Sequence, residues 1–103
     1  MIVARWQIDA KFGHKSQVID SIKRWAEEIG TQIGWKSDQM RMTTGSVGAK
    51  ESTVVTEIEL ENMTELDESW DKLQEIEAHK RWSKDLEQYI VSGSHRWEIY
   101  RVI

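Results

Sequence analysis

The chain of 103 residues has no cysteine and no proline, and it has one phenylalanine beside six tryptophans. Without cysteine it can form no disulfide, no thiolate metal site and no cysteine nucleophile, and a reducing compartment suits it. We therefore expect a cytoplasmic protein. Without proline, its turns must rely on Gly, Asn, Asp and Ser.

Other absences narrow the class of protein. No segment approaches the roughly 20 apolar residues of a membrane helix, and the first residues lack the basic stretch and apolar run of a signal peptide. The net charge is −4 and the pI is about 5.4, with basic residues interleaved among acidic ones. We therefore expect neither membrane nor nucleic-acid binding. The length predicts a single domain over residues 1–103.

What the sequence does contain is an ordered alternation of patterns: strand, helix, strand, strand, helix, strand. The first expected strand, residues 2–10, alternates apolar and polar side chains, as a half-buried strand does. Its two faces carry, respectively, Ile2, Ala4, Trp6, Ile8 and Arg5, Gln7, Asp9. Further strands are expected at residues 38–44, 52–61 and 95–103. The glycine-rich residues 45–51 join two strands, so they predict a hairpin loop and not a phosphate loop, which would precede a helix.

The first helix is predicted by one apolar stripe over residues 18–29, and Gly30 and Gly34 are expected to end it. The second helical region, residues 65–91, has two apolar sets on nearly opposite sides of one projected helix. The sets are Leu66, Trp70, Leu73, Ile76 and Trp82, Leu86, Tyr89, Ile90. This phase reversal predicts a break between Glu77 and Arg81, with two helices meeting near His79.

Two β-α-β units that share one sheet predict an α+β, ferredoxin-like βαββαβ fold. The expected sheet is four-stranded and antiparallel, with strand order 4-1-3-2. The helices should cover the face that holds Trp6, Met40, Ile58 and Trp97. The opposite, polar face must then meet water, a polar cavity or a second subunit.

The chain resembles a known superfamily over nearly its whole length, and two segments carry most of that resemblance. They are the turn Phe12-Gly13-His14-Lys15 and the residues Glu77 to Leu86 around the predicted break, with His79 at the start of the last helix. With these segments the chain resembles the dimeric α/β barrel superfamily, which includes antibiotic-biosynthesis monooxygenase-like and NIPSNAP-like proteins. The resemblance implies a homodimer in which two sheets face each other and enclose a cavity.

In such a dimer the polar face would line the barrel interior and the dimer seam. Its members are Arg5, Gln7, Asp9, Gln39, Arg41, Thr43, Glu57, Glu59, Arg96, Glu98 and Tyr100. Buried charges must be paired, and this set contains both signs. Mutual neutralisation and a ligand-binding arginine are both open alternatives.

Three histidines offer acid–base chemistry. His14 lies in a turn and His95 at a strand start, so both are expected to be solvated. His79 at the helix break is the candidate catalytic acid or base, although a polar residue at a helix junction more commonly satisfies local backbone groups. Glu75 and His79 stand one helical turn apart, but no third ligand accompanies them, so no metal site is expected.

The resemblance also bears on cofactors. Some relatives bind and degrade haem and carry a tryptophan like Trp70, together with a strand-1 asparagine and a histidine deeper in the last helix. Here those two positions offer Gln7 and Lys84, so we expect no haem and no other cofactor.

Two functions stay open at this point. The first is a cofactor-independent oxygenase or isomerase of a small aromatic or polyketide-like molecule. In it His79 would be the acid or base, and Arg5, Gln7, Arg41, Trp70 and Tyr100 would contact the substrate. The second is a non-catalytic protein that dimerises or binds a small molecule, for example in a stress response. Fold alone does not separate them.

Overall fold

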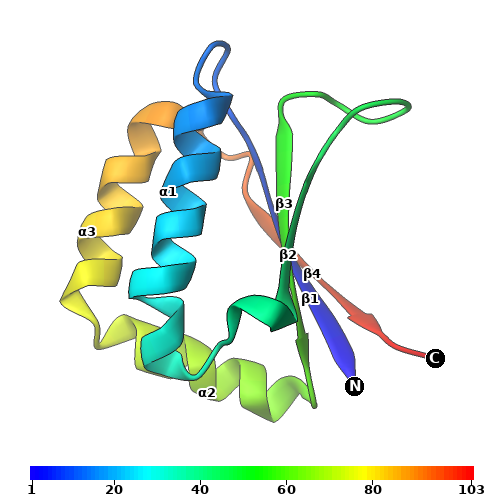
Figure 1. The fold of residues 1–103 in the computed structure, drawn as a ribbon, viewed down its shortest axis with the longest axis vertical. Coiled ribbons are helices and arrows are strands. Elements are labelled where there is room, and N and C mark those ends of the chain that lie inside the picture. Colours follow the sequence, from blue (N-terminus) through cyan, green and yellow to red (C-terminus); the bar gives the residue numbers. More distant parts are fainter.

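The computed structural model describes residues 1–103, and it has the predicted order of strands and helices. Figure 1 shows the helices on one side of the sheet and no helix on the other. The strands and helices are β1 (Ile2–Asp9), α1 (Lys15–Glu28), β2 (Met40–Thr44), β3 (Thr53–Leu60), α2 (Met63–Gln74), α3 (Glu77–Leu86) and β4 (Arg96–Arg101). Short 3₁₀ turns lie at Gly30–Ile33, Ser37–Gln39 and Glu87–Tyr89.

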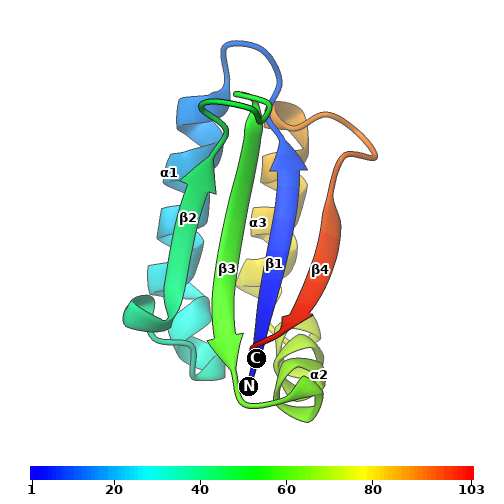
Figure 2. The same cartoon turned by 90° about the vertical axis from the view of Figure 1, so that its right-hand side faces the viewer.

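The sheet has the strand order β2-β3-β1-β4, and every neighbouring pair is antiparallel. Figure 2 shows this sheet from its uncovered side, with the helices behind it. The order is the predicted 4-1-3-2 seen from the other edge, so the ferredoxin-like fold is confirmed. The register places Trp6 opposite both Thr56 and Trp97, and Arg5 opposite both Glu57 and Glu98.

The two faces of the sheet differ as the alternation predicts. Ala4 and Ile8 of β1 are fully buried under the helices, while Arg5 and Gln7 between them are only half-buried. The buried residues form two clusters, one under α2 and the end of α1, the other under the start of α1 and the end of α3. Their burial against the helices leaves the opposite face as the one large surface of the sheet without protein cover.

The helical region is broken as expected, but at Glu75–Ile76, three or four residues before His79, where the two helices were expected to meet. α2 ends at Gln74, and Ile76 is extended with φ −95° and ψ 110° before α3 begins at Glu77. Ile76 packs against the same core cluster as α2, so the turn comes directly after the last residue of the first apolar set. His79 consequently lies in the first turn of α3 and not at the junction itself.

Two smaller expectations also need correction. The predicted strand 38–44 begins only at Met40, because Ser37–Gln39 form a 3₁₀ turn in which the Gln39 side chain accepts a hydrogen bond from the Lys36 N–H. α1 ends at Glu28, and the chain then makes a further 3₁₀ turn before Gly34, whose φ of +84° suits glycine. This turn brings Trp35 into the core.

Candidate functional site

The sheet separates the predicted site residues into two groups. His79 of α3 and Trp70 of α2 lie on the helix side. The other four lie on strands with side chains on the uncovered face: Arg5 and Gln7 on β1, Arg41 on β2 and Tyr100 on β4. The structure therefore brings His79 and Trp70 together, and Arg5 with Tyr100, but it does not bring all six to one place.

The helix side contains an apolar cavity of about 360 Å³ between the helices and the sheet. Its lining includes every tryptophan of the chain together with His79, Met40, Ile22, Leu86 and Thr56. A cavity of this volume, mostly apolar with a few polar groups, has the character of a small-molecule site. It is the strongest candidate for ligand binding in this fold.

His79 is held in this cavity by two tryptophans. The Trp25 indole N–H donates to His79 Nδ1 over 2.9 Å, and the Trp82 ring stacks on the imidazole with centroids 5.8 Å apart. Because Nδ1 accepts a hydrogen bond, the neutral ring carries its proton on Nε2. Burial lowers the pKa of His79 below its ordinary value, which favours this neutral form. His79 is therefore placed to donate a hydrogen bond from Nε2.

Two other polar atoms in residues that line the cavity are buried and lack a hydrogen-bond partner. They are the Thr56 hydroxyl oxygen on β3 and the Trp70 indole nitrogen on α2. Buried polar groups are nearly always paired, so an unpaired hydroxyl and an unpaired N–H beside one cavity call for a partner. An oxygen-bearing ligand would supply one.

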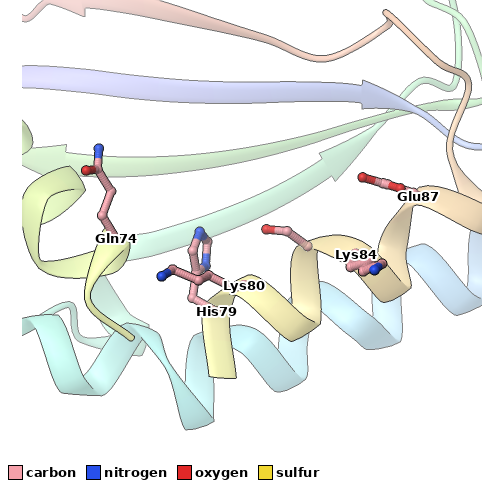
Figure 3. A pocket seen from close by; sticks show the side chains of 6 residues that line it. Gln74, His79, Lys80, Lys84 and Glu87 are labelled. Carbon is pink, nitrogen blue, oxygen red and sulfur yellow. The ribbon is translucent and has the colours of Figure 1, made fainter. Parts of the chain in front are cut away.

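The rim of the cavity is polar. An open groove of about 570 Å³ borders it and shares His79 with it. Figure 3 shows His79 pointing from α3 toward the sheet, with Lys80 beside it, Gln74 on α2 to one side, and Lys84 and Glu87 further along the chain on the other. Polar groups at the mouth and tryptophans inside would orient an amphipathic molecule with its apolar part inward.

The uncovered face carries a row of charges that alternate in sign in strand order: Arg41, Glu57, Arg5 and Glu98. Arg41 and Glu57 approach to 3.1 Å, and Arg5 lies 3.6 Å from both Glu57 and Glu98. The Arg5 guanidinium also lies 5.5 Å from the centre of the Tyr100 ring. These pairs match the mutual neutralisation that the sequence left open beside a ligand-binding arginine.

Two further polar residues of this face, Gln7 and Asp9, are also paired. Gln7 donates a hydrogen bond to Glu98, and Asp9 accepts from Thr53 over 2.7 Å and from Lys50 over 2.9 Å. The bonds from Thr53 and Lys50 lower the pKa of Asp9 below its ordinary value. Around them lies a shallow polar concavity of about 390 Å³.

Of the other acid–base candidates, His95 lines the cavity, whereas Glu75 and His14 do not. Glu75 caps the end of α2 while His79 belongs to α3, so they are not one turn apart on a single helix. No group of three or more His, Asp or Glu side chains that could hold a metal ion is present. His95 is exposed as expected, but His14 is half-buried, because its ring packs 5.5 Å from that of Tyr89. None of the helices has the length and apolar character to cross a bilayer.

Sequence reasoning missed two residues of the cavity. Thr56 shares the apolar face of the strand expected at residues 52–61, and its only signal in the sequence is a hydroxyl between the apolar Val54 and Ile58. Trp25 belongs to the apolar stripe over residues 18–29, and nothing in the sequence signals that its N–H reaches His79, 54 positions away. Such a contact depends on how two helices pack.

Comparison with known proteins places the fold. No family model matches the chain, and no curated protein matches its sequence. Solved structures do match. A NIPSNAP family protein from Agrobacterium tumefaciens superposes with a TM-score of 0.80 at 16% identity, over 99% of this chain and 92% of that one. The chain shares the fold of this NIPSNAP family protein.

Two further structures agree. An uncharacterised NIPSNAP domain protein from Burkholderia xenovorans gives a TM-score of 0.70 at 13% identity, covering 100% of this chain and 95% of its own. An antibiotic biosynthesis monooxygenase gives a TM-score of 0.65 at 12% identity, and the superposition covers 100% of this chain and 99% of that one. The resemblance noted in the sequence is therefore confirmed at the level of fold, and function must be argued from the chain's own cavity.

Proposed function

We propose that the cavity between the helices and the sheet binds a small, planar, aromatic molecule that carries at least one oxygen. The observation that carries this proposal is the pair of unpartnered atoms, Thr56 Oγ1 and Trp70 Nε1, in the lining of a tryptophan-rich cavity. Indole rings suit an aromatic body, while a hydroxyl or carbonyl oxygen would pair the two atoms. Similar structures include an antibiotic biosynthesis monooxygenase, which agrees with such a ligand.

The reaction that this site suits best is cofactor-independent oxygenation or isomerisation of that molecule. His79 Nε2–H would donate to a substrate oxygen and stabilise the negative charge that develops there when an adjacent C–H loses its proton to a water molecule. Trp25 holds Nδ1, so His79 acts as a neutral hydrogen-bond donor in this proposal and not as the base. Trp70 contacts the substrate, and Arg5, Gln7, Arg41 and Tyr100 belong to the other face.

A second function is favoured by the same geometry around His79. Since Trp25 occupies Nδ1 and Nε2 carries the proton, no free base lies in the cavity at His79. A NIPSNAP-like protein that binds the aromatic molecule without changing it, as in a stress response, needs nothing more than the structure provides. Turnover separates the two functions, while binding is common to both.

Binding is tested with 1-naphthol and naphthalene, which share one body and differ by one hydroxyl. We expect 1-naphthol to quench tryptophan fluorescence at lower concentration than naphthalene. In Thr56→Val the preference should shrink by roughly tenfold, because the lost hydrogen bond is worth about 1–3 kcal/mol. Thr43→Val is the matched control, since Thr43 lies on β2 with its side chain on the uncovered face. Equal preference in the parent and in Thr56→Val would refute the ligand class.

Turnover is tested by oxygen uptake with a hydroxyanthrone, whose CH₂ becomes C=O as one O₂ gives one water. An enzyme should consume oxygen above the buffer rate, and His79→Gln should lower that rate while leaving 1-naphthol affinity within a few-fold. Binding without oxygen uptake, and without isomerisation of the added compound, would support the non-catalytic function instead.

We also propose that the protein is a single-domain homodimer joined through the uncovered sheet faces. The face is large, carries both charges and exposes Val102 and Tyr100, which suits a symmetric, partly polar interface. The neutralised row of charges on it makes burial tolerable, because each carboxylate already has a cation beside it. The cytoplasmic location expected from the sequence remains part of this proposal.

A further inference from the structure

The tryptophans form a single unbranched line of ring contacts. Successive ring centroids are 5.7, 5.9, 6.1, 6.5 and 5.4 Å apart. In spatial order the rings are Trp35, Trp25, Trp82, Trp6, Trp97 and Trp70. The line draws on β1, β4 and all three α-helices, and it includes every tryptophan of the chain.

This line has a buried end and an exposed member. Trp35 and Trp25 are 5% and 7% exposed, whereas Trp97 is 38% exposed on the edge strand β4. Aromatic packing accounts for each pair taken singly. Aromatic packing does not require that the pairs join into one path from the core to the surface, nor that every ring of this path lines the same cavity.

Indole is among the side chains most easily oxidised by one electron, and electrons pass readily between aromatic rings in contact. The resulting radical cation is a charge, and burial disfavours charge. A hole formed at any ring of this line should therefore move to the ring that water can reach, which is Trp97.

We propose that the six tryptophans are a relay that carries one-electron oxidising equivalents from the cavity to Trp97. An oxygen-centred radical of the peroxyl class takes one electron from a cavity indole and one proton from water, and becomes a hydroperoxide. Each oxidised ring then takes an electron from the next, until the hole is at Trp97. There Nε1 releases its proton to water, and a donor of the ascorbate class restores the ring with one electron and one proton.

The relay protects the cavity. Without it, the oxidant would modify the indole or the imidazole that it first meets, and His79 lies in contact with two of the rings. This function does not depend on whether the cavity binds 1-naphthol or turns over a substrate, so the two proposals fail separately.

The test places a photo-oxidant at the buried end of the line. Lys36 is exposed and follows Trp35, and the chain has no other cysteine, so Lys36→Cys offers one site for a ruthenium polypyridyl label. Flash oxidation of the label with a sacrificial electron acceptor then supplies the hole, and peptide mass spectrometry locates the oxygenated tryptophan. We expect the product mainly at Trp97 in the labelled parent.

Interrupting the line should move the product. In Trp82→Phe or Trp6→Phe, oxidation should stay on the Trp35 side of the gap and be lost from Trp97. Trp70→Phe is the matched control, because Trp70 lies beyond Trp97 and its loss should leave the Trp97 product unchanged. Circular dichroism checks each fold, and the two interrupting variants act on different elements, so one suffices if the other does not fold. Product at Trp97 in a folded interrupted variant, or confined to Trp35 in the parent, would overturn the relay.

Discussion

The proposed homodimer predicts that a negative charge introduced at position 100 weakens dimerisation, whereas the same charge introduced at position 23 does not. Tyr100 lies on β4 with its ring beside Arg5 on the uncovered face, and it is 47% exposed in the single chain. Lys23 lies on the solvent side of α1. Tyr100→Asp and Lys23→Asp therefore introduce the same group on opposite sides of the molecule.

The size of the effect follows from the symmetry of the dimer. A standard interface removes about 800 Å² from each partner, roughly an eighth of the 6866 Å² surface of this chain. Each dimer contains the substitution twice, and Arg5 already faces Glu57 and Glu98, so a third carboxylate has no free cation. At about 3 kcal/mol for each buried, unpaired carboxylate, the dimer loses about 6 kcal/mol. This raises Kd by roughly four powers of ten.

Light scattering and sedimentation measure this directly. The parent and Lys23→Asp should run as dimers at micromolar concentration, and Tyr100→Asp should run at the monomer mass of 12.1 kDa. Tyr100→Phe keeps the ring and should remain dimeric. A parent of 12.1 kDa at micromolar concentration would refute the dimer. Equal behaviour of the two aspartate variants would place the interface elsewhere.

Two further predictions concern stability. Ser69→Ala should lower the free energy of unfolding by about 1–3 kcal/mol, because the buried Trp35 N–H loses the hydroxyl that it reaches over 3.0 Å; urea denaturation measures it. Burial lowers the pKa of His79, so below about pH 6.5 the imidazole is protonated more fully in the unfolded chain than in the folded one. The free energy of unfolding should therefore fall as the pH drops below about 6.5. Thermal melts between pH 7.5 and 5 should show a shallower fall in His79→Gln.

The sequence was sufficient for the sheet because strand alternation is local. Apolar and polar side chains alternate from Ile2 to Asp9. Because residues i and i+2 of a strand share a face, this alternation assigns both faces, and the observed register agrees. The break in the helical region was predictable for the same reason, from the opposed phases of Leu73 and Trp82. Its position was not, because the residues between Ile76 and Trp82 include only one further apolar side chain, Ala78, to mark the phase.

The candidate site was harder to predict, because it depends on distances between elements. The sequence places Trp6 and Trp97 on the helix face, but it does not show that Trp70 and Trp82 arrive beside them from two different helices. It also drew four of the six candidate site residues from the uncovered face, since the polar residues there are visible in the sequence as a set. Cavity residues such as Thr56 are scattered among apolar ones, so only their missing partners identify them.

Neighbouring residues of β1 belong to the two different faces of the sheet. Arg5 faces the charged row and Trp6 faces the cavity, and each is paired across to both neighbouring strands. Because successive side chains of a strand point to opposite faces, a substitution at one position alters one face while the backbone hydrogen bonds stay in place. A slip of one residue would exchange the faces and bury Arg5 among tryptophans. The alternation along β1 therefore has two consequences. It keeps the proposed dimer face apart from the proposed ligand cavity, and it fixes the register of the strand, since a shift by one residue would bury unpaired charge.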